Sequence, residues 1–333
     1  MDFTKIQSHT ISIYDLNSKK YQLRRVNARS LLTPKRFDLF AKLYYIVNRN
    51  ADKYNAINVY VEHIKTFNPD LKEPGRTDKN TINDFIDVFN RLILDFETKE
   101  FDNDISIIPV DSNGVILDGA HRVAALAFYN KEVTIIQFDD VYAKCEFNYF
   151  YFKKRGLKWN ILDIIAQEMT KWLYNISTVC LYANTSKKLN IRTCLLSEYS
   201  IAYIKRIRIG DSSLIKFRKL IYQNHDFYLD EKKNKINPLN SFFLTGYLTL
   251  LIFEVNDTEF MKLKDGICDN HLIYISNNRK KATDILEITK SIETNLWIKV
   301  INALIEKIFY LKHVKWLKIK VDIASVFANL RNK

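Results

Sequence analysis

Apolar positions in the N-terminal part of the chain follow two different periods. The segments "HTISIYDL" (9–16) and "YQLRRVNARSLL" (21–32) alternate weakly, which predicts short strands or an extended lead-in. "TPKRFDLFAKLYYIVNR" (33–49) predicts a helix, with Thr33 as its cap and Pro34 in its first position. Helical spacing recurs over 55–66 and 81–97, and the polar stretch 68–80 between them, with two prolines and a glycine, predicts a loop.

The centre of the chain carries a compact run of strand, turn and helix signals. "ISIIPV" (105–110) and "GVILDG" (114–119) flank the sequence Asp-Ser-Asn-Gly, and Asn-Gly predicts a hairpin turn because both residues tolerate positive φ. "AHRVAALAFYN" (120–130) predicts a helix and "EVTIIQFD" (132–139) a further strand. The order strand, turn, strand, helix, strand indicates an α+β module that ends near Asp140.

The second half mixes both periods again. A helix is expected over 160–175, strands are expected at 177–183, 200–209 and 244–255, and the chain reads as helical from Lys281 almost to its end. The fold class is therefore α+β, with one domain over 1–145 and a second, basic α+β domain with a helical C-terminus over 146–333. The longest apolar run, 242–255, is too short to cross a bilayer.

Charge divides the chain more sharply than hydropathy does. Residues 1–150 hold 20 Lys and Arg against 21 Asp and Glu, whereas residues 151–333 hold 31 against 17. Such asymmetry indicates different partners for the two halves. The four cysteines are dispersed and form no C-x-x-C pair, and no apolar leader follows the first residues, so we expect a cytoplasmic protein without a zinc site or disulfide framework.

The junction at residues 118–122 concentrates groups that bind anions. Two of the seven glycines of the chain lie within six residues here, and the second leads directly into the helix "AHRVAALAF". A helix start presents free backbone N–H groups and the positive end of the helix dipole. Gly119 would let a phosphate approach, and His121 and Arg122 add donors. Asp118 either coordinates Mg²⁺ or simply caps the helix.

The stretch "IIPVDSNGVILDGAHRVAALAFYNKEVTII" (107–136) resembles the nucleotide-binding core of the ParB/sulfiredoxin superfamily. There, a strand pair leads to a G-x-[HR]-R turn and a helix. Ala120 stands where sulfiredoxins carry cysteine, and the glutamate of the ParB turn is missing. The best match is with the archaeal free-serine kinases, whose turn reads Asp-Gly-His-His-Arg. More weakly, the chain resembles ParB-like proteins encoded among bacterial surface-polysaccharide genes.

The resemblance implies a phosphotransferase that uses ATP or ADP with Mg²⁺ and acts on a small hydroxyl compound, such as a sugar or glycan intermediate. Its catalytic base would be a glutamate preceding the motif, for which Glu62 is the candidate, although a solvated position on an amphipathic helix explains Glu62 equally well. Arg36 would neutralise substrate charge, unless it is an exposed arginine at a helix start. The implied site comprises Asp118 as metal ligand, Glu62, Asp118 and His121 as catalytic residues, and Gly119, Ala120, His121, Arg122, Arg36 and His63 around the nucleotide.

Two other classes of function fit parts of the sequence. A ParB-type, nucleotide-gated nucleic-acid binder would use the basic half, but no compact helix-turn-helix pattern follows residue 150. A non-catalytic scaffold could retain the nucleotide pocket. The basic amphipathic stretch 296–321 is typical of a core-facing helix with a solvated face, of a helix lying on anionic lipid, or of a nucleic-acid surface. His225 and His271 are isolated, and neither is expected to bind a metal.

Overall fold

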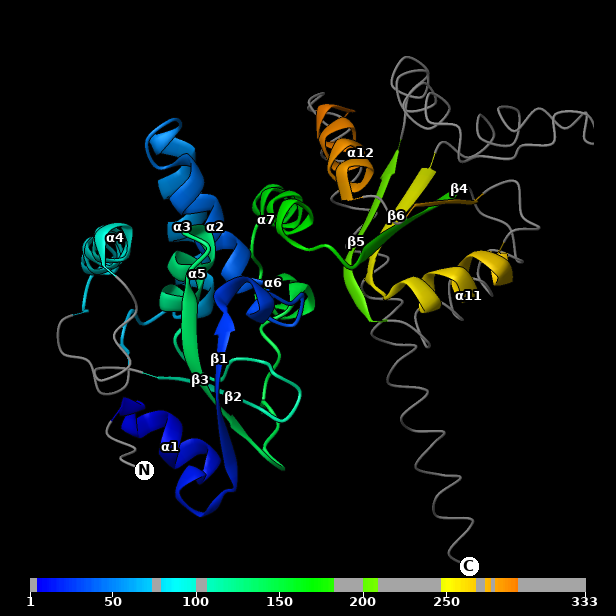
Figure 1. Ribbon diagram of the computed structural model, residues 1–333. Coiled ribbons are helices and arrows are strands. Elements are labelled where there is room, and N and C mark those ends of the chain that lie inside the picture. The colour runs from blue at the N-terminus through cyan, green and yellow to red at the C-terminus, as the bar shows by residue number, and fades with distance from the viewer. Residues whose placement is uncertain are drawn as a thin grey trace, which may run out of the picture. The chain divides into compact units, whose positions relative to one another are not determined.

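The computed structural model describes residues 5–73, 79–99, 107–182, 200–208, 247–267, 273–276 and 279–292. The chain divides into two compact units, Met1–Asn175 and Ile176–Lys333. The mixed helix and strand content agrees with the expected α+β class (Figure 1). The first unit extends thirty residues beyond the boundary expected from the sequence, because α7 (Trp159–Trp172) packs against α2 (Asp38–Asn48) and α3 (Lys53–Phe67).

A three-stranded sheet organises the first unit. β3 (Glu132–Phe138) lies in its centre, antiparallel to β1 (Tyr21–Asn27) and parallel to β2 (Ile108–Val110). The β-branched and aromatic residues of β3 suit a pleated, half-buried surface. α5 (Ala120–Phe128) connects β2 to β3, so the two parallel strands and their helix form a βαβ unit.

Helix α2 is the most buried helix of this unit. It contacts α3, α5 and α7, and residues 38–43 are all buried. α4 (Ile82–Thr98) begins with a capping box in which Thr81 and Asp84 satisfy each other's backbone N–H groups. Its apolar face lies against α5, whose alanines allow close approach. The expected helices over 55–66, 81–97 and 120–130 are therefore confirmed.

Three local expectations in the first unit differ from the structure: the strand over 9–16, the helix start at Pro34 and the hairpin at 105–119. Residues Ser8–Tyr14 form the helix α1 and not a strand, because one helical turn brings Ile11 and Tyr14 together against the core cluster around Phe138. α2 begins at Asp38 and not at Pro34. The residues before it instead form a turn and a single bridge from Arg36 to Phe147.

The expected hairpin at 105–119 is reduced to its turn. Asp111 accepts backbone N–H groups from Asn113 and Val115, and Gly114 adopts φ +78°. Beyond the turn, one bridge from Val110 to Ile116 replaces the expected second strand. The segment therefore reaches Gly119 as an irregular but hydrogen-bonded connection.

The first unit also contains short elements. The 3₁₀ turns span Leu16–Ser18 and Ala28–Leu31, and α6 spans Tyr149–Lys154.

The second unit contains an antiparallel sheet in the order β5-β6-β4-β7. The expected strands are confirmed as β4 (Ile176–Tyr182), β5 (Ile201–Arg208) and β6 (Tyr247–Glu254), while β7 (Ile273–Ser276) and α11 (Asp257–Ile267) were not expected. α12 (Arg279–Ile292) packs on β4 and confirms the start of the expected C-terminal helical region. The basic stretch 296–321, His225 and His271 lie outside the described residues.

Candidate functional site

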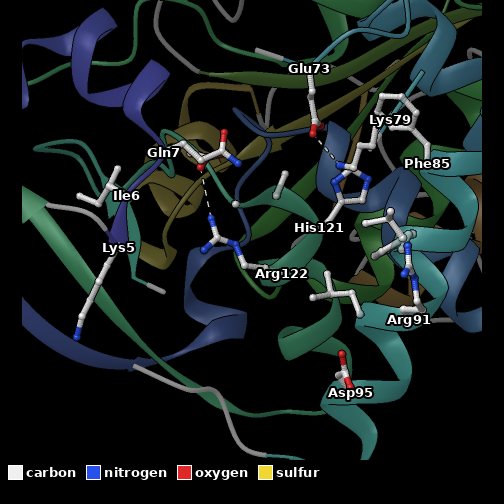
Figure 2. Close-up of a pocket in the computed structure, with 16 residues that line it drawn as sticks. Lys5, Ile6, Gln7, Glu73, Lys79, Phe85, Arg91, Asp95, His121 and Arg122 are labelled. Carbon is white, nitrogen blue, oxygen red and sulfur yellow. Dashed lines mark hydrogen bonds and ion pairs between the residues drawn. The ribbon is translucent and has the colours of Figure 1, made fainter. Parts of the chain in front are cut away.

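A cavity of about 620 Å³ opens at the N-terminal end of α5. Its walls are residues 5–7, one face of α4 and the first turn of α5, together with Glu73 and Lys79 (Figure 2). The α4 wall is apolar because Phe85, Val88 and Phe89 recur at helical spacing and face α5. The cavity thus combines one apolar wall with a polar end, a composition that is typical of small-molecule sites.

The polar end is built from the backbone of α5. Gly119 is the N-cap, with φ +84° and ψ +23°, and the first bond of the helix runs from the N–H of Val123 to the carbonyl of Gly119. The N–H groups of Ala120, His121 and Arg122 precede this bond, so the helix does not use them. These three donors and the positive end of the helix dipole favour an anion at this position.

Glycine is required at position 119 for space as well as for conformation. A Cβ atom there would lie 2.7 Å from Ile108 Cδ1 and 2.9 Å from Arg122 Nη2. The guanidinium of Arg122 therefore folds over the bare backbone of Gly119, and its Nη2 lies 3.3 Å from Asp118 Oδ2. Both charged side chains remain about one-fifth exposed, so a ligand in the cavity can reach them.

His121 lines the cavity and is held by an aromatic cluster. Its Nε2 lies 2.9 Å from the hydroxyl of Tyr60, and its ring packs edge-on against Phe89 with the centroids 4.7 Å apart. Burial lowers the pKa of His121 well below its ordinary value, and the cations Lys42 and Lys79 lower it further. His121 is therefore neutral at physiological pH.

An ion pair lies beside His121. Lys79 Nζ is 2.7 Å from Glu73 Oε2; Lys79 is buried while Glu73 keeps about three-tenths of its side chain exposed. Lys79 also lies over the ring of Phe85, 5.0 Å from its centroid. Figure 2 shows His121, Lys79 and Glu73 gathered in one part of the cavity. A carboxylate and a buried cation therefore stand close to the proposed phosphate position.

A further cation lines the cavity on α4. Arg91 is exposed, and no other side chain of the described residues bonds to it. Together with Lys5, Lys79 and Arg122 it gives the cavity four basic side chains, against the carboxylates Glu73, Asp95 and Asp118. Asp95 is engaged by Lys99 at 3.0 Å, which weakens its contribution to the cavity.

The structure brings together Asp118, Gly119, Ala120, His121 and Arg122, as the sequence predicts, but it does not bring Glu62 to them. Glu62 does not line the cavity; its Oε2 pairs with Lys158 Nζ at 2.9 Å. His63 is fully buried, packs against Phe152 and leaves both ring nitrogens without a hydrogen-bond partner among the described atoms. His63 does not line the cavity either.

Arg36 is not the exposed arginine expected at a helix start. Its Nε and Nη2 donate to the two oxygens of Asp38 at 2.8 and 2.9 Å, and its Nη1 donates to the carbonyl of Ile116. Lys42 Nζ donates to the same carboxylate at 3.0 Å. All three charged side chains are buried. Arg36 therefore connects the start of α2 to the segment that leads into Gly119.

This buried cluster has a defined charge state. Burial alone would raise the pKa of Asp38, but Arg36 and Lys42 outweigh burial and hold this pKa far below its usual range. Burial lowers the pKa of Lys42, and Asp38 opposes that shift. Two buried cations thus share one carboxylate. Removing the carboxylate would leave both cations buried without a counterion, which destabilises the fold.

Sequence reasoning missed Tyr60, Glu73, Lys79 and Arg91. Glu73 and Lys79 lie in the polar stretch 68–80, where composition indicates a loop and gives no direction for a side chain. Arg91 borders the predicted apolar face of α4, which is the one available signal. Tyr60 lies in the same helix as Glu62, but two residues correspond to about 200° of helical rotation.

Asp118 is the candidate metal ligand of this cavity. Within the described residues, no group of three or more His, Cys, Asp or Glu side chains converges on one point. Mg²⁺ is commonly held by one or two carboxylates together with substrate phosphates and waters. Asp118 fits this mode, since a single exposed carboxylate beside an anion site is all that the protein must supply.

Comparisons with protein-family models, curated proteins and solved structures found no match for this chain. The resemblance of the turn at 118–122 to nucleotide-binding proteins therefore stays a prediction. Among the helices within the described ranges, none combines the length and the apolarity needed to cross a membrane.

Proposed function

We propose that the first unit binds a nucleotide, ATP or ADP, through its phosphates at the N-terminus of α5 and transfers a phosphoryl group to a small hydroxyl acceptor. A sugar or glycan intermediate is the acceptor class that the sequence resemblance favours. The observation that carries the proposal is that the first turn of α5, whose N–H groups precede the first intrahelical bond, lines one cavity together with Lys79. That cavity, at about 620 Å³, matches the size of common ligand sites.

The polar groups at the start of α5 and beside it have separate roles in this proposal. The N–H groups after Gly119 and the guanidinium of Arg122 hold the phosphates, because a planar guanidinium binds a phosphate through two parallel hydrogen bonds. Lys79 supplies a second positive charge. Asp118 would hold Mg²⁺, which when bound neutralises phosphate charge.

Glu73, and not Glu62, is the carboxylate proposed to accept the proton of the acceptor hydroxyl. Glu73 lines the cavity beside His121, whereas Glu62 pairs with Lys158 elsewhere on α3. The Lys79 ammonium donates to Glu73 Oε2 at 2.7 Å and so fixes the position of the Glu73 carboxylate. Positioned general bases typically contribute roughly 100-fold or more to a rate.

The direct test incubates the protein with ATP, ADP or CTP, Mg²⁺ and a panel of sugars, and follows phosphate transfer by ³¹P NMR. Phosphorylation of any acceptor supports the proposal. Nucleotide-dependent retention of DNA without transfer to any acceptor would instead identify a ParB-type nucleic-acid binder and overturn the kinase proposal.

Two pairs of variants test the roles. Arg122→Ala should weaken nucleotide binding in calorimetry by roughly tenfold or more, since hydrogen bonds to charged groups are worth about 1.5–3 kcal/mol. Arg24→Ala, which removes an exposed arginine bonded to Gln137, should leave binding unchanged. Glu73→Gln should abolish turnover with binding intact, whereas Glu62→Gln should retain turnover; the reverse result would restore Glu62 as the base.

A further inference from the structure

The hydroxyl of Tyr60 makes the only described hydrogen bond to the ring of His121, and it does so inside the protein. Tyr60 is fully buried, and its oxygen lies 2.9 Å from His121 Nε2. Its ring stacks against Tyr45 and Phe89, with centroids 5.0 and 5.4 Å away, so the hydroxyl cannot swing elsewhere without disturbing the core. Nε2 is therefore committed to Tyr60.

The other ring nitrogen, Nδ1, is the one left for a ligand. His121 lines the cavity, and among the described residues Nδ1 has no hydrogen-bond partner. A neutral imidazole carries one proton, so exactly one of its two nitrogens can donate. If that proton is on Nε2, His121 presents a lone pair to the cavity and repels a phosphate; if it is on Nδ1, His121 donates to the phosphate.

Two acceptors compete for the Tyr60 proton. Its oxygen lies 2.9 Å from His121 Nε2 and 3.4 Å from the carbonyl oxygen of Phe85. Hydrogen bonds weaken over this range, and an O–H donor prefers distances near 2.8 Å. The shorter contact favours donation of the Tyr60 proton to Nε2, which leaves Nε2 as the unprotonated nitrogen.

The surroundings of the cavity oppose this tautomer, which makes the Tyr60 bond necessary. The four basic side chains of the cavity outnumber its three carboxylates, and the N–H groups of α5 add positive partial charge. A positive potential favours a lone pair on the side of the ring that faces it. Without Tyr60, the proton would prefer Nε2, which is also the favoured position for histidine in water.

We infer that Tyr60 is a positioning residue that fixes the Nδ1–H tautomer of His121, so that a neutral histidine donates a hydrogen bond to a phosphate in the cavity. The role of the phosphate rests on the function proposed above, but the tautomer itself does not. The neutral charge of His121 matters because an uncharged donor binds a product phosphate less tightly than a further cation would.

The test is ¹⁵N NMR of the full chain labelled in its histidines, with the His121 signals assigned by their loss in His121→Gln. In the unsubstituted protein without nucleotide, Nδ1 should give a protonated, pyrrole-type shift and Nε2 an unprotonated, pyridine-type shift. In Tyr60→Phe, which keeps the aromatic ring, the two shifts should exchange or average. An Nε2–H tautomer in the unsubstituted protein, or no change in Tyr60→Phe, overturns the inference.

Tyr45→Phe is the matched control. Tyr45 belongs to the same stack, but its hydroxyl donates to Asn90 Oδ1 at 2.8 Å and does not touch His121. It should lose comparable stability and leave the His121 tautomer unchanged; a tautomer shift in Tyr45→Phe as well would show a packing effect and refute the role of the Tyr60 hydroxyl.

Measurements of ADP binding distinguish a failure of the inferred tautomer from a failure of the proposed function. Tyr60→Phe should weaken ADP binding in calorimetry by roughly tenfold, the effect of one hydrogen bond to a charged ligand, whereas Tyr45→Phe should not. If the NMR result holds but neither the unsubstituted protein nor the variants bind ADP or pyrophosphate, the inferred tautomer stands and the proposed function fails. If Tyr60→Phe and the unsubstituted protein bind ADP equally tightly, the Nδ1–H group does not contact phosphate.

Discussion

Replacing Gly119 by alanine tests whether the bare backbone at the start of α5 is required. Two penalties apply. An L-residue in the left-handed conformation of Gly119 costs about 1–2 kcal/mol. The added methyl would also lie 2.7 Å from Ile108 Cδ1, and overpacking of this kind costs about 1–3 kcal/mol. We therefore expect Gly119→Ala to lower the free energy of unfolding by about 2–5 kcal/mol.

Gly114→Ala isolates the steric part of this penalty. Gly114 has nearly the same φ, +78°, but a Cβ there would meet nothing within 4 Å. Both substitutions restrict the unfolded chain equally, so this contribution cancels between them. Urea unfolding should therefore show Gly119→Ala to be less stable than Gly114→Ala by about 1–3 kcal/mol.

The same pair of variants has a functional readout. The methyl at position 119 would displace the guanidinium of Arg122, whose Nη2 lies 2.9 Å from the added atom. Nucleotide affinity should therefore fall in Gly119→Ala and remain unchanged in Gly114→Ala. Equal losses of stability in the two variants, or full nucleotide affinity in Gly119→Ala, would refute the close approach of Ile108 and Arg122 to residue 119.

Three further predictions concern the buried polar groups. In urea unfolding, Asp38→Asn should lower the free energy of unfolding by about 3–5 kcal/mol, because Arg36 and Lys42 would become buried cations without a counterion. The control Asp95→Asn, on the surface of α4, should change this free energy by at most ~0.5 kcal/mol. His63→Leu should raise stability by about 1 kcal/mol in the same assay, since it removes two buried nitrogens that lack partners; a loss of several kcal/mol would show that they are satisfied. Burial lowers the pKa of His63, so the unfolded chain binds more protons and stability should fall as the pH drops below about 6.5, with a shallower slope in His63→Leu.

Local signals predicted the elements whose ends are fixed by their own residues. The capping box of Thr81 and Asp84 sets the start of α4, and the Asn-Gly turn forms with Gly114 at positive φ. The junction at Gly119 is also local, since a glycine at positive φ and the alanine-rich helix after it define the junction. These features were readable because each depends on neighbours within four residues.

The start of α2 could not be predicted because distant residues decide it. Thr33 and Pro34 form a good helix start by themselves, yet Arg36 bridges to Phe147 and bonds the carbonyl of Ile116, which lies 80 positions along the chain. These contacts hold residues 33–37 out of the helix. No periodicity within the segment contains this information.

The identity of the base illustrates a second limit. A helical pattern shows which residues share a face, but not which face meets the active site. In α3, Tyr60 faces α5 while Glu62, about 200° around the helix, faces Lys158. For this reason we propose Glu73 as the base in place of Glu62. Only the structure shows that the Glu73 carboxylate, bonded to Lys79, lies beside His121.

Arg36 and Lys42 act on the site without lining the cavity. Arg36 holds the carbonyl of Ile116, two residues before Asp118, and so fixes the approach to the phosphate turn. Lys42 is one of the cations that lower the pKa of His121 after burial has done so. Asp38 keeps both side chains in place. Asp38 therefore positions the turn through Arg36 and holds the Lys42 ammonium. Loss of Asp38 should disturb nucleotide binding even though Asp38 lies outside the cavity.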